Sequence, residues 1–262
     1  MIRVSVQENL LPGDDLPAKW AVVRDAGLDG IELRGRAGMR ERLPELRADV
    51  RAGVVASSVC LDGPPFIGAF AAADRARAVE ALKGMLDVAA EVGARGVVTP
   101  AAYGIHSNRL PPFTAPRPAE EDREVLLEAL TTLGRHAASR GVEVWLEPLN
   151  RYEDHMVNTL AQGADLCRAV GLPSVRLLAD LFHMNVEEGD MGAALREAGP
   201  LVAHVHLADS SRLEPGTGHT DFAGVLAALA DMGFDGWGAL ECRLSAPPAQ
   251  AMRAALAALR GA

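Results

Sequence analysis

Residues 120–150 read EEDREVLLEALTTLGRHAASRGVEVWLEPLN and contain one complete step of the fold. Residues 120–140 are rich in Ala, Leu, Arg and Glu with helical periodicity, and Gly141 follows as a glycine that can cap the helix in the left-handed conformation. Residues 142–150 are apolar almost throughout and end in polar residues, as in a strand covered on both faces. The stretch therefore predicts a helix, a cap glycine and a buried parallel strand.

The same unit recurs along the chain. Glycines at 27, 93, 141, 171 and 233 precede further apolar runs, and we expect eight strands, at 2–8, 30–35, 54–62, 95–102, 142–150, 174–184, 202–210 and 237–243. Eight such units in 262 residues predict a (β/α)8 TIM barrel forming a single domain over 1–262. An open doubly wound sheet is the alternative, but no GxGxxG follows the first strand.

Composition and charge restrict the partners. The chain has 49% hydrophobic and 23% charged residues, which is ordinary for a soluble globular protein. Its net charge of -9 disfavours binding to nucleic acid, which depends on clustered Lys and Arg. The three cysteines are widely spaced, so we expect buried thiols rather than disulfides or a zinc site. No signal peptide or membrane span is evident, and we expect a cytoplasmic protein without a membrane partner.

Polar residues stand at the ends of four successive predicted strands. They are Glu147, then Asp180 and His183, then His204 and His206, and finally Glu241. Because the strands of a barrel end at the same face, these side chains should converge near its axis. We expect one member of each close pair to point into the barrel and the other away.

A single strand-end glutamate is usually an ion-pair partner, but a recurring set needs another explanation. Three converging carboxylates would repel one another unless a cation joined them. Two glutamates, one aspartate and one imidazole form an oxygen-rich set that favours Mn²⁺, Mg²⁺ or Co²⁺ over structural zinc. The sequence therefore predicts one divalent metal ion, most readily Mn²⁺, and leaves open which imidazole binds it.

The segments LEPLNRYE, LLADLFHMNVEE, HVHLADSSRLEPGTG and ALE, between residues 142 and 243, resemble the xylose isomerase-like TIM-barrel sugar isomerases and epimerases, especially the ketose 3-epimerases typified by D-tagatose 3-epimerase. The resemblance implies a metal site of Glu147, Asp180, His206 and Glu241, with Glu147 and Glu241 as the acid/base pair. It further implies that Glu153, His183 and Arg212 bind substrate, and that the protein is a homo-oligomer, a dimer or tetramer. Strand one departs from the family in ending with Gln7-Glu8 instead of an aromatic residue.

The chemistry implied is proton transfer at a carbon next to a ketone. One glutamate removes the proton and the other returns one to the opposite face, inverting the centre. The expected substrate is a free ketose epimerised at C3, or a small hydroxy-carbonyl compound such as hydroxypyruvate undergoing aldose–ketose isomerisation. The absence of an evident phosphate clamp argues against a sugar phosphate.

Three other functions fit the same barrel. A lyase such as a dehydratase remains open. An endonuclease of the endonuclease IV kind is disfavoured, because the third and fourth predicted strands offer no histidines. A non-catalytic sugar sensor would not need both Glu147 and Glu241. The proline-rich segment at 101–118, with His106, is expected to form a lid or rim loop.

Overall fold

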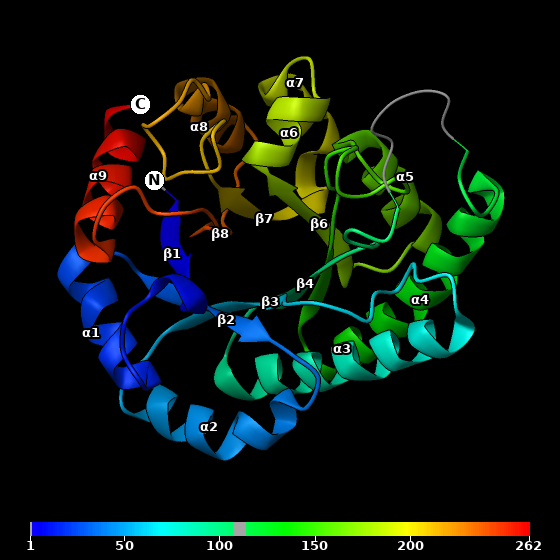
Figure 1. Cartoon of the computed structure of the whole chain (residues 1–262), viewed down its shortest axis with the longest axis horizontal. Coiled ribbons are helices and arrows are strands. Elements are labelled where there is room, and N and C mark those ends of the chain that lie inside the picture. Colours follow the sequence, from blue (N-terminus) through cyan, green and yellow to red (C-terminus); the bar gives the residue numbers. More distant parts are fainter. Residues whose placement is uncertain (1, 107–113) are drawn as a thin grey trace.

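The computed structural model describes residues 2–106 and 114–262 and forms a closed parallel barrel with the strand order β1-β2-β3-β4-β5-β6-β7-β8 (Figure 1). The strands are β1 (Arg3–Gln7), β2 (Gly30–Gly35), β3 (Ala56–Leu61), β4 (Gly96–Pro100), β5 (Glu143–Glu147), β6 (Val175–Asp180), β7 (Val202–Leu207) and β8 (Trp237–Leu240). Pairing of β1 with β8 closes the barrel, with Val6 beside Leu240. The predicted (β/α)8 barrel is confirmed, and the open doubly wound sheet is excluded.

Helices surround the strands on the outside (Figure 1). They are α1 (Leu16–Ala26), α2 (Leu43–Arg51), α3 (Ala72–Val92), α4 (Ala119–Arg140), α5 (Leu160–Val170), α6 (Leu181–Glu187), α7 (Met191–Ala198), α8 (Phe222–Asp231) and α9 (Pro248–Gly261). The cap glycine of the opening stretch behaves as expected, since Gly141 ends α4 with φ 71° and its N–H donates to the carbonyls of Ala137 and Ala138. After this turn the chain enters β5.

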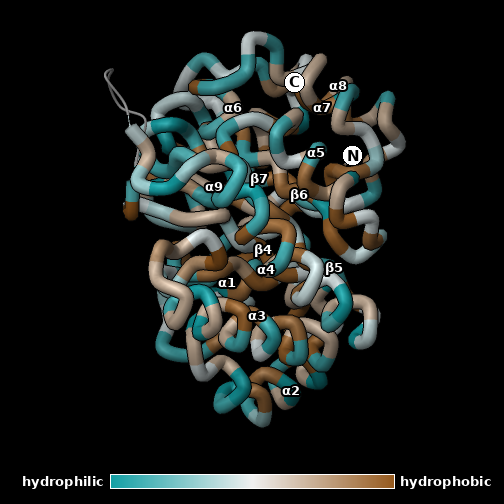
Figure 2. Tube along the Cα trace, turned by 90° about the vertical axis from the view of Figure 1, so that its right-hand side faces the viewer, coloured by the Kyte–Doolittle hydropathy of each residue, from teal (hydrophilic) through white to brown (hydrophobic). Residues whose placement is uncertain are grey.

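Two apolar layers hold the barrel together. Outward-facing residues of the strands, such as Val144 and Leu146, pack with the helices in one large buried cluster. Figure 2 shows the hydrophobic colour concentrated on the central strands, and the hydrophilic colour more frequent on the outer helices. Inside the barrel, Trp145 packs with Val98 and Leu178. Gly96 leaves room for this ring, because a Cβ there would lie 2.6 Å from it.

The register of the strands sets the height of each polar residue. Asp180 on β6 pairs with His206 on β7, Pro100 on β4 pairs with Glu147 on β5, and Gln7 on β1 pairs with Glu32 on β2. Glu241 follows the last residue of β8 directly, and its N–H faces the carbonyl of Leu207. The carboxyl ends of both halves of the barrel therefore present polar side chains at one face.

One boundary differs from the sequence prediction in a way that matters for the site. The strand expected over 174–184 ends at Asp180, and Leu181–Glu187 form α6. Asp180 is the N-cap of this helix, and its Oδ1 accepts hydrogen bonds from the N–H groups of Phe182 and His183. His183 thus lies in the first turn of a helix and not on a strand.

Candidate active site

Four polar side chains meet at the carboxyl ends of β5 to β8. The carboxylates of Glu147, Asp180 and Glu241 and the imidazole of His206 each offer one ligand atom, and these atoms all lie within 4.8 Å of one another. Glu147, Asp180 and His206 are buried, whereas Glu241 is partly exposed. The expected convergence of strand-end residues is confirmed.

The two nitrogens of His206 face different surroundings. Nδ1 lies 2.8 Å from Oε2 of Glu241, 3.4 Å from Oε1 of Glu147 and 3.6 Å from Oδ2 of Asp180. It is fully buried and makes no aligned hydrogen bond with any described residue. Nε2, in contrast, lies 2.9 Å from Oε1 of Glu32. The imidazole therefore directs Nδ1 at the carboxylates.

These residues fit a divalent cation. A buried imidazole nitrogen without an aligned hydrogen bond, surrounded by three carboxylates, forms a group of ligand atoms that one divalent cation would satisfy together. Carboxylate oxygens with one imidazole are donors that Mn²⁺ and Mg²⁺ accept. The four side chains are candidate metal ligands, and Glu32 with His204 and His206 forms a second candidate group.

The surroundings of Glu147 and Glu241 shift the pKa values of the two carboxyl groups in opposite directions. Burial raises the pKa of Glu147, and the negative charges of Glu241 and Asp180 add to this effect against the opposing hydrogen bond from His206. Burial also acts on Glu241, but the positive charges of His206 and Arg212 outweigh it and lower its pKa. Two carboxylates with opposed pKa shifts are the arrangement that separates a proton donor from a proton acceptor.

Asp180 and His206 carry the opposite charges of the cluster. Arg212 and His183 hold the pKa of Asp180 well below its usual value despite its burial. Burial opposes the charge of His206, but the carboxylates of Glu241 and Glu32 raise its pKa well above the usual range. Asp180 is therefore an anion, and the surrounding carboxylates favour the protonated form of His206.

Arg212 lies between two of the candidate ligands. Its Nη1 contacts Oδ2 of Asp180 at 2.6 Å, and its Nη2 contacts Oε2 of Glu241 at 2.7 Å. The residue has a φ of 58°, the left-handed region that a non-glycine residue rarely adopts, and its guanidinium lies 4.8 Å from the centre of the Phe182 ring. The guanidinium thus neutralises the same oxygens that a divalent cation would bind.

His183 presents one nitrogen to the cluster. Its Nδ1 accepts hydrogen bonds from the backbone N–H of Asn150 at 3.3 Å and from the Asn150 side-chain amide at 2.8 Å. Its Nε2 lies 3.8 Å from Oε2 of Glu153 and 3.9 Å from Oε1 of Glu147. Because both Asn150 groups donate, the ring keeps its proton on Nε2, where it can donate to a ligand.

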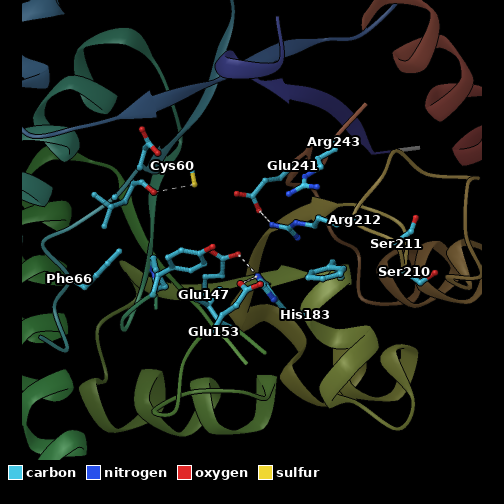
Figure 3. Close-up of a pocket in the computed structure, with 17 residues that line it drawn as sticks. Cys60, Phe66, Glu147, Glu153, His183, Ser210, Ser211, Arg212, Glu241 and Arg243 are labelled. Carbon is cyan, nitrogen blue, oxygen red and sulfur yellow. Dashed lines mark hydrogen bonds and ion pairs between the residues drawn. The ribbon is translucent and has the colours of Figure 1, made fainter. Parts of the chain in front are cut away.

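An open cavity of about 640 Å³ lies above the cluster. Figure 3 shows Glu147, Glu153 and His183 on one side of it and Glu241 and Arg212 on the other. Further lining residues come from the first half of the barrel, including Cys60 and Phe66. The structure therefore brings all three expected substrate-binding residues, Glu153, His183 and Arg212, to the same cavity as the candidate ligands.

The expectation that one imidazole of the HVH pair points away from the barrel is wrong. His204 and His206 are two residues apart on β7 and share a face, and each donates from Nε2 to Glu32 at 2.9 Å. His204 also stacks on Trp145, with 4.8 Å between the ring centres. Burial lowers the pKa of His204, so its ring is neutral inside the barrel.

The sequence reasoning missed three residues that contact the candidate site. They are Glu32 and Gln7, from the first two strands, and Asn150, which follows β5. The available signal was Glu32 itself, a carboxylate between Ile31 and Leu33 in the predicted strand GIELRG. The structure buries it completely. A buried carboxylate needs partners, and here they come from β1, β3 and β7.

Other expectations are settled or lie outside the structure. Cys60, Cys167 and Cys242 are free and buried, as expected. His219 bonds to Ser210, and His106 packs against His155. Residues 107–113 of the expected lid fall outside the described residues. None of the described helices has the length and apolar character needed to cross a membrane.

Residues 20–262 match the xylose isomerase-like TIM barrel family, so the chain belongs to that family. It is 35% identical over 261 residues to the 3-dehydro-D-guloside 4-epimerase of Escherichia coli, covering 99% of both chains. It is 33% identical over 229 residues to an L-ribulose 3-epimerase of Mesorhizobium japonicum, covering 84% of this chain and 73% of the relative.

The solved structures agree with these relatives. The structure of a 3-keto-D-glucoside 4-epimerase from E. coli covers 100% of both chains with a TM-score of 0.94 and 34% identity. An L-ribulose 3-epimerase covers 100% of this chain and 95% of its own, with a TM-score of 0.86 and 25% identity. The relatives are sugar epimerases, and the chain is accordingly an enzyme of the isomerase class.

Proposed function

We propose that this enzyme is a divalent-metal-dependent epimerase that inverts the carbon next to the ketone of a sugar. The observation that carries the proposal is the buried group of Glu147, Asp180, His206 and Glu241, in which the two glutamates have opposed pKa shifts. Inversion requires a proton to leave one face of a carbon and another to arrive at the opposite face. Two carboxyl groups in different protonation states supply both functions.

The proposed roles follow from the charges. Glu241, whose pKa is lowered, removes the proton as the base, and Glu147, whose pKa is raised, returns a proton to the opposite face. One turnover leaves Glu241 protonated and Glu147 ionised, so Glu241 releases a proton to water and Glu147 takes one up before the next turnover. The roles of the two residues exchange in the reverse reaction. A divalent cation, preferably Mn²⁺, would be held by the four ligands and would supply positive charge to the carbonyl oxygen as negative charge develops there.

The remaining residues hold the sugar. His183 donates from Nε2, and Arg212 offers a guanidinium that contacts Asp180 and Glu241 when no substrate or cation competes for it. Glu153, whose side chain is about one third exposed at the cavity, accepts from sugar hydroxyls. These groups fix the ketone and its neighbouring carbon between the two glutamates.

We favour a glycoside with a ketone at C3, epimerised at C4, as the substrate. The support is the 4-epimerase of E. coli, which matches this chain from end to end, whereas the ribulose epimerase match covers less of both proteins. A 3-keto-D-glucoside and a 3-dehydro-D-guloside differ at C4, which lies next to the ketone. A free ketose epimerised at C3 is the second candidate, supported by the ribulose epimerase, because the same proton transfer applies to it.

The test is proton exchange in D₂O followed by NMR. Mn²⁺ would be used for turnover, and the products would be stripped of metal before spectra are recorded. We expect deuterium at C4 of a methyl 3-keto-D-glucoside, together with its C4 epimer, and EDTA should stop both. Deuterium at C3 of L-ribulose alone would favour the second candidate. Exchange at neither carbon, with metal bound, would refute the epimerase proposal.

A further inference from the structure

We propose that Glu32 is a positioning residue that fixes the proton of His206 on Nε2 and so leaves Nδ1 as the metal ligand. This inference rests on the metal site of the proposed function and concerns residues of the first half of the barrel. Its argument depends on the hydrogen bonds around one buried carboxylate.

Glu32 lies in the middle of β2 with an exposed fraction of 0%. Oε1 accepts from Nε2 of His206 at 2.9 Å and from Nε2 of Gln7 at 3.2 Å. Oε2 accepts from Nε2 of His204 at 2.9 Å and from Oγ of Ser58 at 2.7 Å. Four donors from three strands occupy both oxygens, which suits an ionised carboxylate that only accepts.

The proton on His206 follows from this arrangement. An ionised carboxylate has no hydrogen to donate, so the ring nitrogen beside it must carry one. His204 occupies the other oxygen in the same way, and Ser58 and Gln7 fill the remaining positions. The lone pair of a neutral His206 ring therefore resides on Nδ1, the nitrogen that faces Glu147, Asp180 and Glu241.

Gln7 orients the carboxylate of Glu241 through a hydrogen bond. Its single amide nitrogen lies 2.8 Å from Oε1 of Glu241 and 3.2 Å from Oε1 of Glu32. This holds Oε1 of Glu241 toward β1, while Oε2 faces Nδ1 of His206 at 2.8 Å. Glu32 and Gln7 together thus orient two of the four proposed ligands, and neither would touch the cation itself.

Glu32, His204 and His206 could alternatively hold a second cation. The two N···O distances of 2.9 Å are hydrogen-bond lengths, and Ser58 and Gln7 already bind the same carboxylate. The geometry therefore points to a hydrogen-bonded support for one metal site. The stoichiometry of metal binding separates these two arrangements.

The first experiment is Mn²⁺ titration of Glu32→Gln by isothermal calorimetry without substrate. Glutamine keeps the size of the side chain but places a donor opposite one of the two imidazoles. We expect a 10- to 100-fold loss of affinity, the usual effect of removing a partner of a metal-bound histidine, with one site retained. Glu32→Asp should retain more affinity than Glu32→Gln, because it keeps the charge.

Ser57→Ala is the matched control. Ser57 is a buried hydroxyl of β3 that bonds to Ser5, to the carbonyl of Ile31 and to Oγ of Ser58. It makes no direct bond to Glu32, and its substitution leaves the bond from Ser58 to Glu32 in place. Its removal should leave the Mn²⁺ affinity within twofold of wild type. Circular dichroism and thermal unfolding without metal would verify that each variant is folded.

A second measurement needs no variant. Wild-type protein with ¹⁵N-labelled histidine, loaded with diamagnetic Mg²⁺, should show the ring proton of His206 on Nε2. A ring proton on Nδ1, an unchanged affinity in folded Glu32→Gln, or two Mn²⁺ ions per chain would overturn the inference.

These results separate the inference from the proposed function. If the wild-type chain binds no divalent metal, the proposed metal site and the inference both fail. If the wild-type chain binds metal and epimerises sugars while Glu32→Gln binds metal equally well, the inference alone fails. If metal binding and the ring proton are as expected but no sugar is epimerised, the inference stands and the proposed reaction fails.

Discussion

The two halves of the barrel contribute to the site in different ways. Strands β5 to β8 each bring one candidate ligand at or just beyond the carboxyl end, namely Glu147, Asp180, His206 and Glu241. Strands β1 to β3 bring Gln7, Glu32 and Ser58. Gln7 and Ser58 both donate to Glu32, and within the described part of the chain this group contacts the candidate ligands through Glu241 and His206. In the proposed reaction, the second half supplies the charged groups, and the hydrogen bonds of the first half orient two of them.

This difference shows what barrel closure accomplishes. Gln7 and Glu241 are separated by 234 positions in the chain, yet the pairing of β1 with β8 brings their side chains to 2.8 Å. His206 and Glu32 meet across the barrel interior in the same way. A site assembled from one half of the barrel therefore depends on residues whose positions are set by the other half.

The largest effect should come from the two proposed acid/base residues of the second half. Glu147→Gln and Glu241→Gln should each lower kcat about 10³-fold, because the amide cannot transfer the proton. Ser58→Ala, which removes one bond to Glu32, should lower kcat less than about 10-fold, since the typical net value of one hydrogen bond is about 1 kcal/mol. Steady-state kinetics with the substrate identified by NMR would measure these effects, and a larger loss in Ser58→Ala than in Glu147→Gln would reverse the assignment of roles.

Removal of the metal should lower the Tm of the folded chain, and only the substitution of a proposed ligand should abolish this effect. At a free Mn²⁺ concentration 100 times its Kd, binding should stabilise the folded chain by about 2.7 kcal/mol. This corresponds to roughly 5–10 °C in Tm for a domain of this size. Thermal unfolding with Mn²⁺ and with EDTA should show the shift in wild type and in Ser57→Ala but not in Asp180→Asn. A full shift in Asp180→Asn would exclude Asp180 as a ligand.

Asn150→Ala should have a smaller effect that is confined to His183. The substitution removes the side-chain donor to Nδ1 and leaves only the longer backbone contact. A loss of about 1.4 kcal/mol predicts a roughly 10-fold fall in kcat/KM. Asn158→Ala is the control in the same loop, because its amide bonds to the carbonyls of Leu149 and Asp154 and not to His183. Equal losses of kcat/KM in both variants would indicate a general effect of the loop.

Asp154 is a buried carboxylate of the second half that lies outside the group of candidate ligands. Burial raises the pKa of Asp154 from 3.8 to about 7. Between these values the folded chain binds more protons than the unfolded chain, so this carboxyl lowers the free energy of unfolding as the pH rises. Asp154→Asn should remove this pH dependence. The free energy of unfolding of the variant relative to wild type should therefore rise by roughly 2 kcal/mol between pH 5 and pH 8. Urea unfolding at both pH values would measure the difference, and a pH-independent difference would contradict the assigned pKa.

Much of the second half could be predicted from the sequence, for a physical reason. A carboxylate at the end of an apolar strand is conspicuous, and the strand-end rule of parallel barrels places successive examples together. This pattern predicts Glu147, Asp180 and Glu241, and the family resemblance selects His206 over His204. The predicted strand over 174–184 is too long, because Asp180 is the N-cap at which α6 begins.

The first half could not be predicted to the same depth. Glu32 was visible as a charge within a buried run, but its four donors come from β1, β3 and β7, and no local pattern pairs them. In the second half, the two-residue spacing of His204 and His206 on β7 already predicts that they share a face, which contradicts the expectation that one of them points away from the barrel. The contact of Asn150 with the site cannot be predicted from the sequence, because it depends on His183, which α6 brings within hydrogen-bond distance of Asn150.

The most direct test of this division is the anomalous scattering of Mn²⁺ in crystals of the wild-type enzyme. The account predicts one peak per chain, among the carboxylates of Glu147, Asp180 and Glu241 and Nδ1 of His206, with Nε2 of His206 still bonded to Glu32. A peak between Glu32 and His204, or no peak at saturating Mn²⁺, would contradict it.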